Sequence, residues 1–192
     1  MKSIFTIGHS THSWSFFLDL IKPYNIDVLV DVRSKPYSKM ALDFNRETLK
    51  KLLEKENIRY LFMGDKLGGR SNDPDCIVEG RVDYYEIAKS TDFQDGFKRL
   101  LKGANEYTVA LMCAEKEPLD CHRTILISRH LVDAGLAVNH ILQNGQLEEH
   151  NETIDRLLLE EKLSQDMFRS KDEVIADAYR ERGMKIAYKA EE

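Results

Sequence analysis

The stretch Tyr107–Cys113, YTVALMC, runs straight into the polar stretch 114–123, AEKEPLDCHR. The first stretch has the length and apolar character of a buried strand, and a helical pattern follows the second. A strand that ends in a thiol and carboxylates, with Cys-His-Arg before the next helix, is typical of an α/β protein. In such folds an anion or a nucleophile lies where the strand passes into the helix. We therefore expect this stretch to contribute both to the core of the fold and to its functional site.

The same alternation extends in both directions from this stretch. Apolar runs predict strands at residues 4–7, 26–30, 58–63, 107–113 and 138–142. Helical periodicity lies between them, and Asp120 is the predicted N-cap of the helix that follows the fourth strand. The alternation predicts a three-layer α/β sandwich with a mainly parallel sheet. We expect residues 1–150 to form this α/β domain and 151–192 a C-terminal helical extension of it, with charged, surface-lying helices.

Composition narrows the class of protein. The chain has 192 residues, enough for one domain with a full core, and is 42% hydrophobic and 32% charged, which indicates a globular protein. Its net charge of -5 does not favour nucleic acid as a partner, although a local basic patch would allow it. No apolar run reaches the roughly 18 residues of a membrane span, and the start, MKSIFTIGHS, has a strand pattern rather than that of a signal peptide. We expect a cytoplasmic protein with no membrane partner.

Polar residues follow four of the predicted strands, and parallel strands bring their carboxyl ends to one edge of the sheet. These residues are His9 and Ser10; Asp31 and Arg33; Gly68 and Gly69; and Cys113, Glu115, Cys121, His122 and Arg123. The coincidence of four motifs at one edge predicts a shared site more strongly than any single motif does.

The same motifs resemble those of the domain of unknown function 488 family. The matching pieces are TIGHS at 6–10, DVR at 31–33 with Pro36 and Ser38, LGG at 67–69, CAE at 113–115 and CHR at 121–123. The resemblance covers roughly residues 3 to 150, and it implies an α/β fold with a shared site. It implies no particular activity, so chemical roles have to come from the residues.

Four residues are candidates for catalysis. His9, Asp31 and Glu115 are acid–base candidates, and Cys113 is a candidate nucleophile because a helix N-terminus and a nearby arginine would lower the pKa of its thiol. Each residue also has a structural alternative. His9 would stabilise a turn, Asp31 would pair with Arg33, Cys113 would pack in the core, and Glu115 would be a solvated loop residue.

The remaining candidates are for ligand binding. Arg123, with the free N–H groups of its helical turn, and Arg33 are predicted to hold an anion, whereas the alternative for each arginine is a salt bridge within the protein. The other predicted ligand-binding residues are Ser10, Gly68, Gly69, Cys121 and His122.

These residues favour an enzyme, or an enzyme-like protein, that acts on a phosphate- or carboxylate-bearing small molecule such as a nucleotide. Two other classes stay open, a non-catalytic module that binds a nucleotide or nucleic acid, and a metal- or thiol-redox protein. Cys113, Cys121, His122 and His9 offer soft and imidazole ligands, but no CxxC or HxxxH spacing is present, so we assign no metal ligand from the sequence. The sequence leaves the cofactor, the oligomeric state and catalysis itself open.

Overall fold

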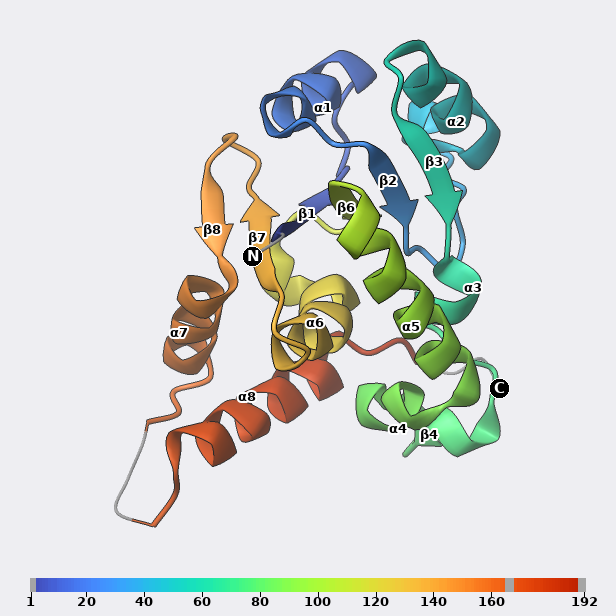
Figure 1. Cartoon of the computed structure of the whole chain (residues 1–192). Helices are drawn as coiled ribbons and strands as arrows, with labels where there is room; N and C mark the ends of the chain where they lie inside the picture. The colour runs from blue at the N-terminus through green and yellow to red at the C-terminus, as the bar shows by residue number, and fades with distance from the viewer. Residues whose placement is uncertain (1–2, 165–167, 190–192) are drawn as a thin grey trace.

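The computed structural model describes residues 3–164 and 168–189. Its centre is a six-stranded sheet in the order β3-β2-β6-β1-β7-β8 (Figure 1). The strands are β1 (Ser3–Gly8), β2 (Val28–Asp31), β3 (Arg59–Phe62), β6 (Val109–Cys113), β7 (Ala137–Ile141) and β8 (Leu147–Glu149). Only β8 runs antiparallel to its neighbour among these six strands, so the predicted mainly parallel sheet is confirmed.

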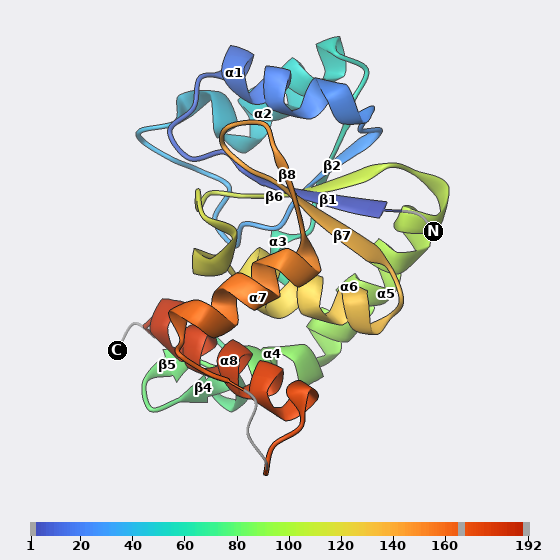
Figure 2. The same cartoon turned by 90° about the vertical axis from the view of Figure 1, so that its left-hand side faces the viewer.

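Helices cover both faces of the sheet, which gives the three layers that the sequence predicts (Figure 2). On one face lie α1 (Trp14–Ile21) and α2 (Arg46–Lys55), and on the other lie α5 (Thr91–Glu106) and α6 (Arg129–Asp133). Alternate strand residues face the two layers, as the pleat requires. Apolar side chains of β2 and β6 thus contribute to a separate core on each face.

The C-terminal helices pack against the helical segment that follows β6. They are α7 (His150–Glu160) and α8 (Lys171–Ile186). Their contact with this segment is a third apolar cluster, formed by Leu119, Ile125, Ile154, Leu157, Ala178 and Tyr179. The two helices are therefore packed against the rest of the fold through apolar side chains. The domain boundary at residue 150 stays a prediction. In the described ranges no helix combines the length and the apolar character that crossing a membrane requires.

Short elements fill the connections. The irregular stretch 64–82 contains the one-turn helix α3 (Gly64–Leu67), a 3-10 turn (Pro74–Cys76) and the hairpin of β4 (Ile77–Val78) and β5 (Arg81–Val82). The helix α4 (Tyr84–Lys89) follows it. Further 3-10 turns lie at Lys22–Tyr24, Leu42–Phe44 and Pro118–Asp120.

The helix after β6 begins later than the sequence predicts. Asp120 does not cap it, because Asp120 ends a 3-10 turn and Cys121 is extended, with φ -135° and ψ 138°. A π-helical segment, Arg123–Ser128, comes next and leads into α6. The side chain of Glu117 caps the 3-10 turn by accepting from the Leu119 N–H, which leaves Asp120 without a capping role. Residues 121–128 are all buried, and π-helical turns of this kind are frequent at functional sites.

Candidate metal centre

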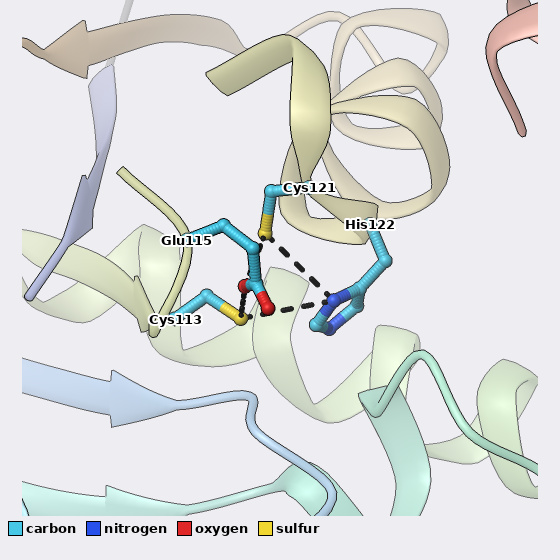
Figure 3. A group of neighbouring side chains, drawn as sticks. All are labelled: Cys113, Glu115, Cys121 and His122. Carbon is cyan, nitrogen blue, oxygen red and sulfur yellow. Dashed lines mark hydrogen bonds between the residues drawn. The ribbon is translucent and has the colours of Figure 1, made fainter. Parts of the chain in front are cut away.

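Cys113, Glu115, Cys121 and His122 form a compact cluster at the carboxyl end of β6 (Figure 3). Cys113 is the last residue of β6, which lies between β1 and β2 in the middle of the sheet. Glu115 follows in the loop, and Cys121 and His122 come just before the π-helical segment. One donor atom from each side chain lies within 4.8 Å of the other three. We call these four residues the thiol cluster.

The donor atoms of the thiol cluster point toward one another. One carboxylate oxygen of Glu115, Oε2, lies 2.7 Å from Cys113 Sγ and 3.2 Å from Cys121 Sγ. The Nδ1 atom of His122 lies 3.8 Å from each of the two sulfurs. Cys113, Cys121 and His122 are buried, whereas Glu115 is exposed. The cluster is therefore closed on the protein side and reaches solvent through Glu115.

The imidazole of His122 is oriented by the main chain. Its Nε2 lies 3.1 Å from the carbonyl oxygen of Val32, which only an Nε2–H can satisfy. A neutral His122 therefore presents the lone pair of Nδ1 to the two sulfurs. Metal-binding histidines usually have this arrangement, in which one ring nitrogen donates to a carbonyl oxygen and the other nitrogen binds the metal.

Glycines let the loops approach this cluster closely. A Cβ atom at Gly69 would lie 2.7 Å from the ring of His122, so any larger residue at this position would displace the ring. A Cβ atom at Gly8, which pairs with Cys113 across β1 and β6, would collide with the carbonyl oxygen of Glu115. The two glycines thus serve the packing of the thiol cluster.

The electrostatics of the cluster separate the two cysteines. Burial raises the pKa of the Cys113 thiol well above its usual value, and the neighbouring Cys121 raises it further. Burial also opposes ionisation of Cys121, but the Cys113 thiol, Arg123 and His122 outweigh it and hold the pKa of Cys121 well below its usual value. Burial lowers the pKa of His122, yet Cys121 and Glu115 raise it more. These charges favour Cys121 as the more acidic thiol of the two, and the role of Cys113 as a nucleophile stays a prediction.

A second group, His9, Asp31 and Arg33, lies at the same edge and is satisfied internally. Arg33 donates from Nε and Nη2 to Asp31 at 2.9 and 2.7 Å, and Tyr60 donates to the same carboxylate at 2.8 Å. The Nη1 atom of Arg33 lies 3.0 Å from Nε2 of His9, whose Nδ1 lies 2.8 Å from the carbonyl of Ser10. Burial, and then the charge of Arg33, lower the pKa of His9 to about 4. Both ring nitrogens of His9 therefore have partners within the protein, and the acid–base roles of His9 and Asp31 stay predictions.

The side chain of Arg123 contacts the loop that precedes it. Its side chain is fully buried, and it donates to the carbonyl oxygens of Glu115, at 2.7 Å, and Lys116, at 3.3 Å. Its own N–H lies 3.4 Å from Cys121 Sγ. Because the helix starts as a π-helical segment, the guanidinium turns under the 114–117 loop and fixes that loop. Anion binding by Arg33 and Arg123 stays a prediction, with both guanidinium groups engaged by the protein.

Ser10 and Gly68 connect loops around the site. Ser10 has a left-handed backbone, with φ 49°, and its N–H donates to the carbonyl of Ala114 at 2.9 Å. A Cβ atom at Gly68 would collide with the Ser34 hydroxyl oxygen. Ligand binding by Ser10 and Gly68 also stays a prediction.

Sequence reasoning missed three contributors to the site. The carbonyl of Val32 orients His122, and a main-chain group leaves no signal in the residue types. Tyr60 lies on β3 beside the strand of Asp31, and a hydroxyl next to apolar residues of that strand was the available signal. Burial, and then the charges of Cys121, Glu115 and Cys113, raise the pKa of Tyr84, and no motif connects this residue with the site.

Comparison with known proteins identifies a family for this chain. The family model described as "Domain of unknown function DUF488" matches residues 13–130. The chain belongs to this family. Neither the curated proteins nor the solved structures contain a significant match to the chain. In this DUF488 member the matched segment holds the whole thiol cluster, together with Val32, Arg33 and Gly69, and Gly8 and His9 come just before it.

Proposed function

We propose that this protein binds a transition-metal ion of the zinc class through the thiol cluster, and that the ion is the working centre of an enzyme-like site. The observation that carries the proposal is the convergence of two sulfurs, one imidazole nitrogen and one carboxylate oxygen within 4.8 Å. Cysteine, histidine and carboxylate are the ligands that Zn²⁺ takes in proteins, in tetrahedral sites.

The separations suit a tetrahedral ion. With metal–sulfur bonds of about 2.3 Å and metal–nitrogen bonds of about 2.0 Å, a tetrahedral centre places sulfur and nitrogen roughly 3.6 Å apart. The Nδ1 atom of His122 lies 3.8 Å from both sulfurs. Glu115 lies slightly too close to the sulfurs, and a small rotation of its exposed side chain corrects that separation.

The charges also favour a cation. The acidic groups of the cluster are two thiols and a carboxylate, and the guanidinium of Arg123 is turned away to the carbonyls of Glu115 and Lys116. Bringing sulfur and carboxylate together in a buried place costs free energy unless a proton or a metal ion lies between them. A coordinated metal ion neutralises both thiolates at once.

The proposal gives one purpose to the five sequence motifs. The CAE and CHR motifs supply the ligands, and the DVR motif supplies the Val32 carbonyl that orients His122. Gly69 of the LGG motif leaves room for the His122 ring, and Gly8 of the TIGHS motif leaves room for the Glu115 carbonyl. No motif is left without a role in the construction of the centre.

The metal ion takes over the role that the sequence assigned to the arginines. A phosphate- or carboxylate-bearing small molecule would be attracted to a cation at this edge of the sheet, which is where open α/β sheets bind ligands. The small anionic ligand and the cytoplasmic location both stay predictions of the sequence.

Metal analysis of the purified full-length protein tests the proposal. We expect about one zinc per chain, retained against a weak chelator, in the wild type and in Cys76→Ser. Cys76 is buried in the 3-10 turn far along the chain from the cluster, so it is the matched control. Cys113→Ser and Cys121→Ser should lose the ion.

Two results would count against the metal centre. One is a wild-type protein that takes up no zinc or cobalt when reduced. The other is full metal content in the Cys121→Ser variant. If the reduced protein binds no metal but mild oxidant links Cys113 to Cys121, the thiol-redox alternative replaces the proposal.

A further inference from the structure

The four groups of the thiol cluster are not equally fixed. Cys113 ends the central strand β6, paired on both sides by β1 and β2. His122 is held at Nε2 by the Val32 carbonyl, and Cys121 accepts from the Arg123 N–H. These three side chains are buried and anchored, so an ion would find them already in place.

Glu115 differs in both exposure and attachment. It is the exposed member of the cluster, and in the described part of the chain its carboxylate contacts the two sulfurs alone. Its main chain is nevertheless fixed, because the carbonyl oxygen accepts from Arg123 at 2.7 Å. The carboxylate can therefore swing away from the sulfurs into solvent while its backbone keeps it within reach of them.

The difference between Glu115 and the other three side chains bears on the kind of metal site that they can form. Structural zinc sites are closed by four cysteine or histidine ligands, whereas catalytic sites have three protein ligands and one open position. Two thiolates balance the charge of a divalent ion, so an ion held by Cys113, Cys121 and His122 carries no net charge. A fourth, anionic oxygen is then the ligand that such a centre gives up most easily.

We propose that Glu115 is an exchangeable ligand and that the centre is a catalytic one which activates water; this rests on the metal site proposed above. The bond between the metal and Glu115 breaks as a bond between the metal and a water oxygen forms. The water's proton passes to the freed carboxylate, which leaves a hydroxide on the metal as the nucleophile. Glu115 thus acts first as a ligand and then as a general base.

Cobalt substitution with azide as the external ligand tests the exchange. Reduced full-length protein is titrated with Co²⁺, whose visible bands report coordination geometry and whose thiolate charge-transfer band reports the sulfur ligands. Azide is then added to the wild type, Glu115→Ala, Glu115→Gln and the loop control Lys116→Ala. Lys116 is the exposed neighbour of Glu115, and its carbonyl contact with Arg123 survives the substitution.

We expect Glu115→Ala and Glu115→Gln to retain Co²⁺ with less than about tenfold loss of affinity, whereas Cys121→Ala should lose more than about 100-fold. Azide should shift the visible bands saturably in the wild type and in Lys116→Ala, and at several-fold lower concentration in Glu115→Ala. Circular dichroism of the metal-free variants confirms that each is folded.

The possible failures are distinguishable. If Co²⁺ binds with its thiolate band but azide alters no spectrum, the fourth position is closed and the exchange is wrong, although the metal site stands. If Glu115→Ala and Glu115→Gln lose Co²⁺ as completely as Cys121→Ala does, Glu115 is a fixed ligand and the inference is equally wrong. If the wild type shows no thiolate band at all, the metal site itself fails.

Discussion

Two clusters of side chains contain buried histidines, and they differ in how the polar atoms of those histidines are satisfied. In the thiol cluster, Nδ1 of His122 is 3.8 Å from its nearest partners, two sulfurs. In the second cluster, Thr6, His140, His150 and Tyr179 form an unbroken chain with separations of 2.7, 3.0 and 2.7 Å. We call these four residues the histidine chain.

The histidine chain joins four elements of the fold. Thr6 lies on β1, His140 on β7, His150 at the start of α7 and Tyr179 on α8. If every imidazole is neutral, all three hydrogen bonds point the same way along the chain, either from Tyr179 toward Thr6 or from Thr6 toward Tyr179. Burial and then the charge of its neighbour His150 hold the pKa of His140 well below its usual value, and burial lowers the pKa of His150 to about 4.

The difference shows how to distinguish a ligand cluster from a structural network. Every nitrogen in the histidine chain has a partner at hydrogen-bonding distance, so that network needs nothing from outside. In the thiol cluster one ring nitrogen of His122 is fixed by a carbonyl oxygen, and the other has only long hydrogen bonds of 3.8 Å to two sulfurs. A site that is preorganised but incomplete within the protein is the one to assign to a ligand.

The largest expected effect comes from replacing one histidine of each cluster by glutamine. We predict that His122→Gln lowers Zn²⁺ affinity by more than about 100-fold, because the amide cannot replace an imidazole ligand, while the metal-free protein unfolds close to wild type. His140→Gln should do the reverse, with a clear loss of stability and unchanged metal affinity. Chelator competition and urea unfolding measure the two quantities. Loss of metal in His140→Gln would remove the distinction between the clusters.

Acid should unfold the protein partly through the histidine chain. His150 has a pKa of about 4 in the folded protein and an ordinary value of 6.5 in the unfolded one, so between these pH values only the unfolded state binds the proton. Stability therefore falls as pH falls through this range. From pH 6.5 to 4.5 the metal-free wild type should lose roughly 2 kcal/mol more than His150→Gln, in urea unfolding with chelator present. Parallel curves would show that His150 is not held neutral.

The sequence predicted the sheet well because apolar runs report burial directly. The strand expected at 107–113 is β6, and the other four expected strands match within two residues. The antiparallel strand β8 was missed because Leu147–Glu149 is short and largely polar. The π-helical segment was missed because residues 121–128, which include it, are all buried and show no amphipathic period that would mark where the helix begins.

The site was predicted as a location but not as a coordination geometry. The residue types at the strand ends correctly predicted that the motifs meet at one edge of the sheet. They could not show that Arg33 pairs with Asp31 or that Arg123 donates to main-chain carbonyls. Nor could they show that Cys113 and Cys121, eight residues apart, converge through a 3-10 turn and an extended residue. Because the backbone between these residues is irregular, their spacing in the sequence does not reveal that their side chains converge as metal ligands do.

A smaller effect should come from Gly69, which touches the thiol cluster without being a ligand. A methyl group there would lie 2.7 Å from the His122 ring and would displace it from the Val32 carbonyl. We expect Gly69→Ala to weaken Zn²⁺ binding by about 10- to 100-fold, as outer-shell changes do. The control is Gly103→Ala in α5, where nothing lies within 4 Å, and metal affinity should not change. Equal affinities in both variants would mean that the ring needs no such support.

The smallest expected effect concerns the end of the histidine chain. Tyr179→Phe removes the hydroxyl that hydrogen bonds to His150 Nε2 but keeps the ring, which still packs against Arg129 at 4.8 Å. Leaving a buried polar atom unpaired costs about 1–3 kcal/mol. We expect that loss in urea unfolding, with Zn²⁺ affinity unchanged, because Tyr179 has no contact with the thiol cluster. Tyr85→Phe is the matched control, since Tyr85 is 62% exposed and its hydroxyl can be hydrated. A stability loss in Tyr179→Phe no larger than in Tyr85→Phe would mean that the chain does not hold α8 to the sheet.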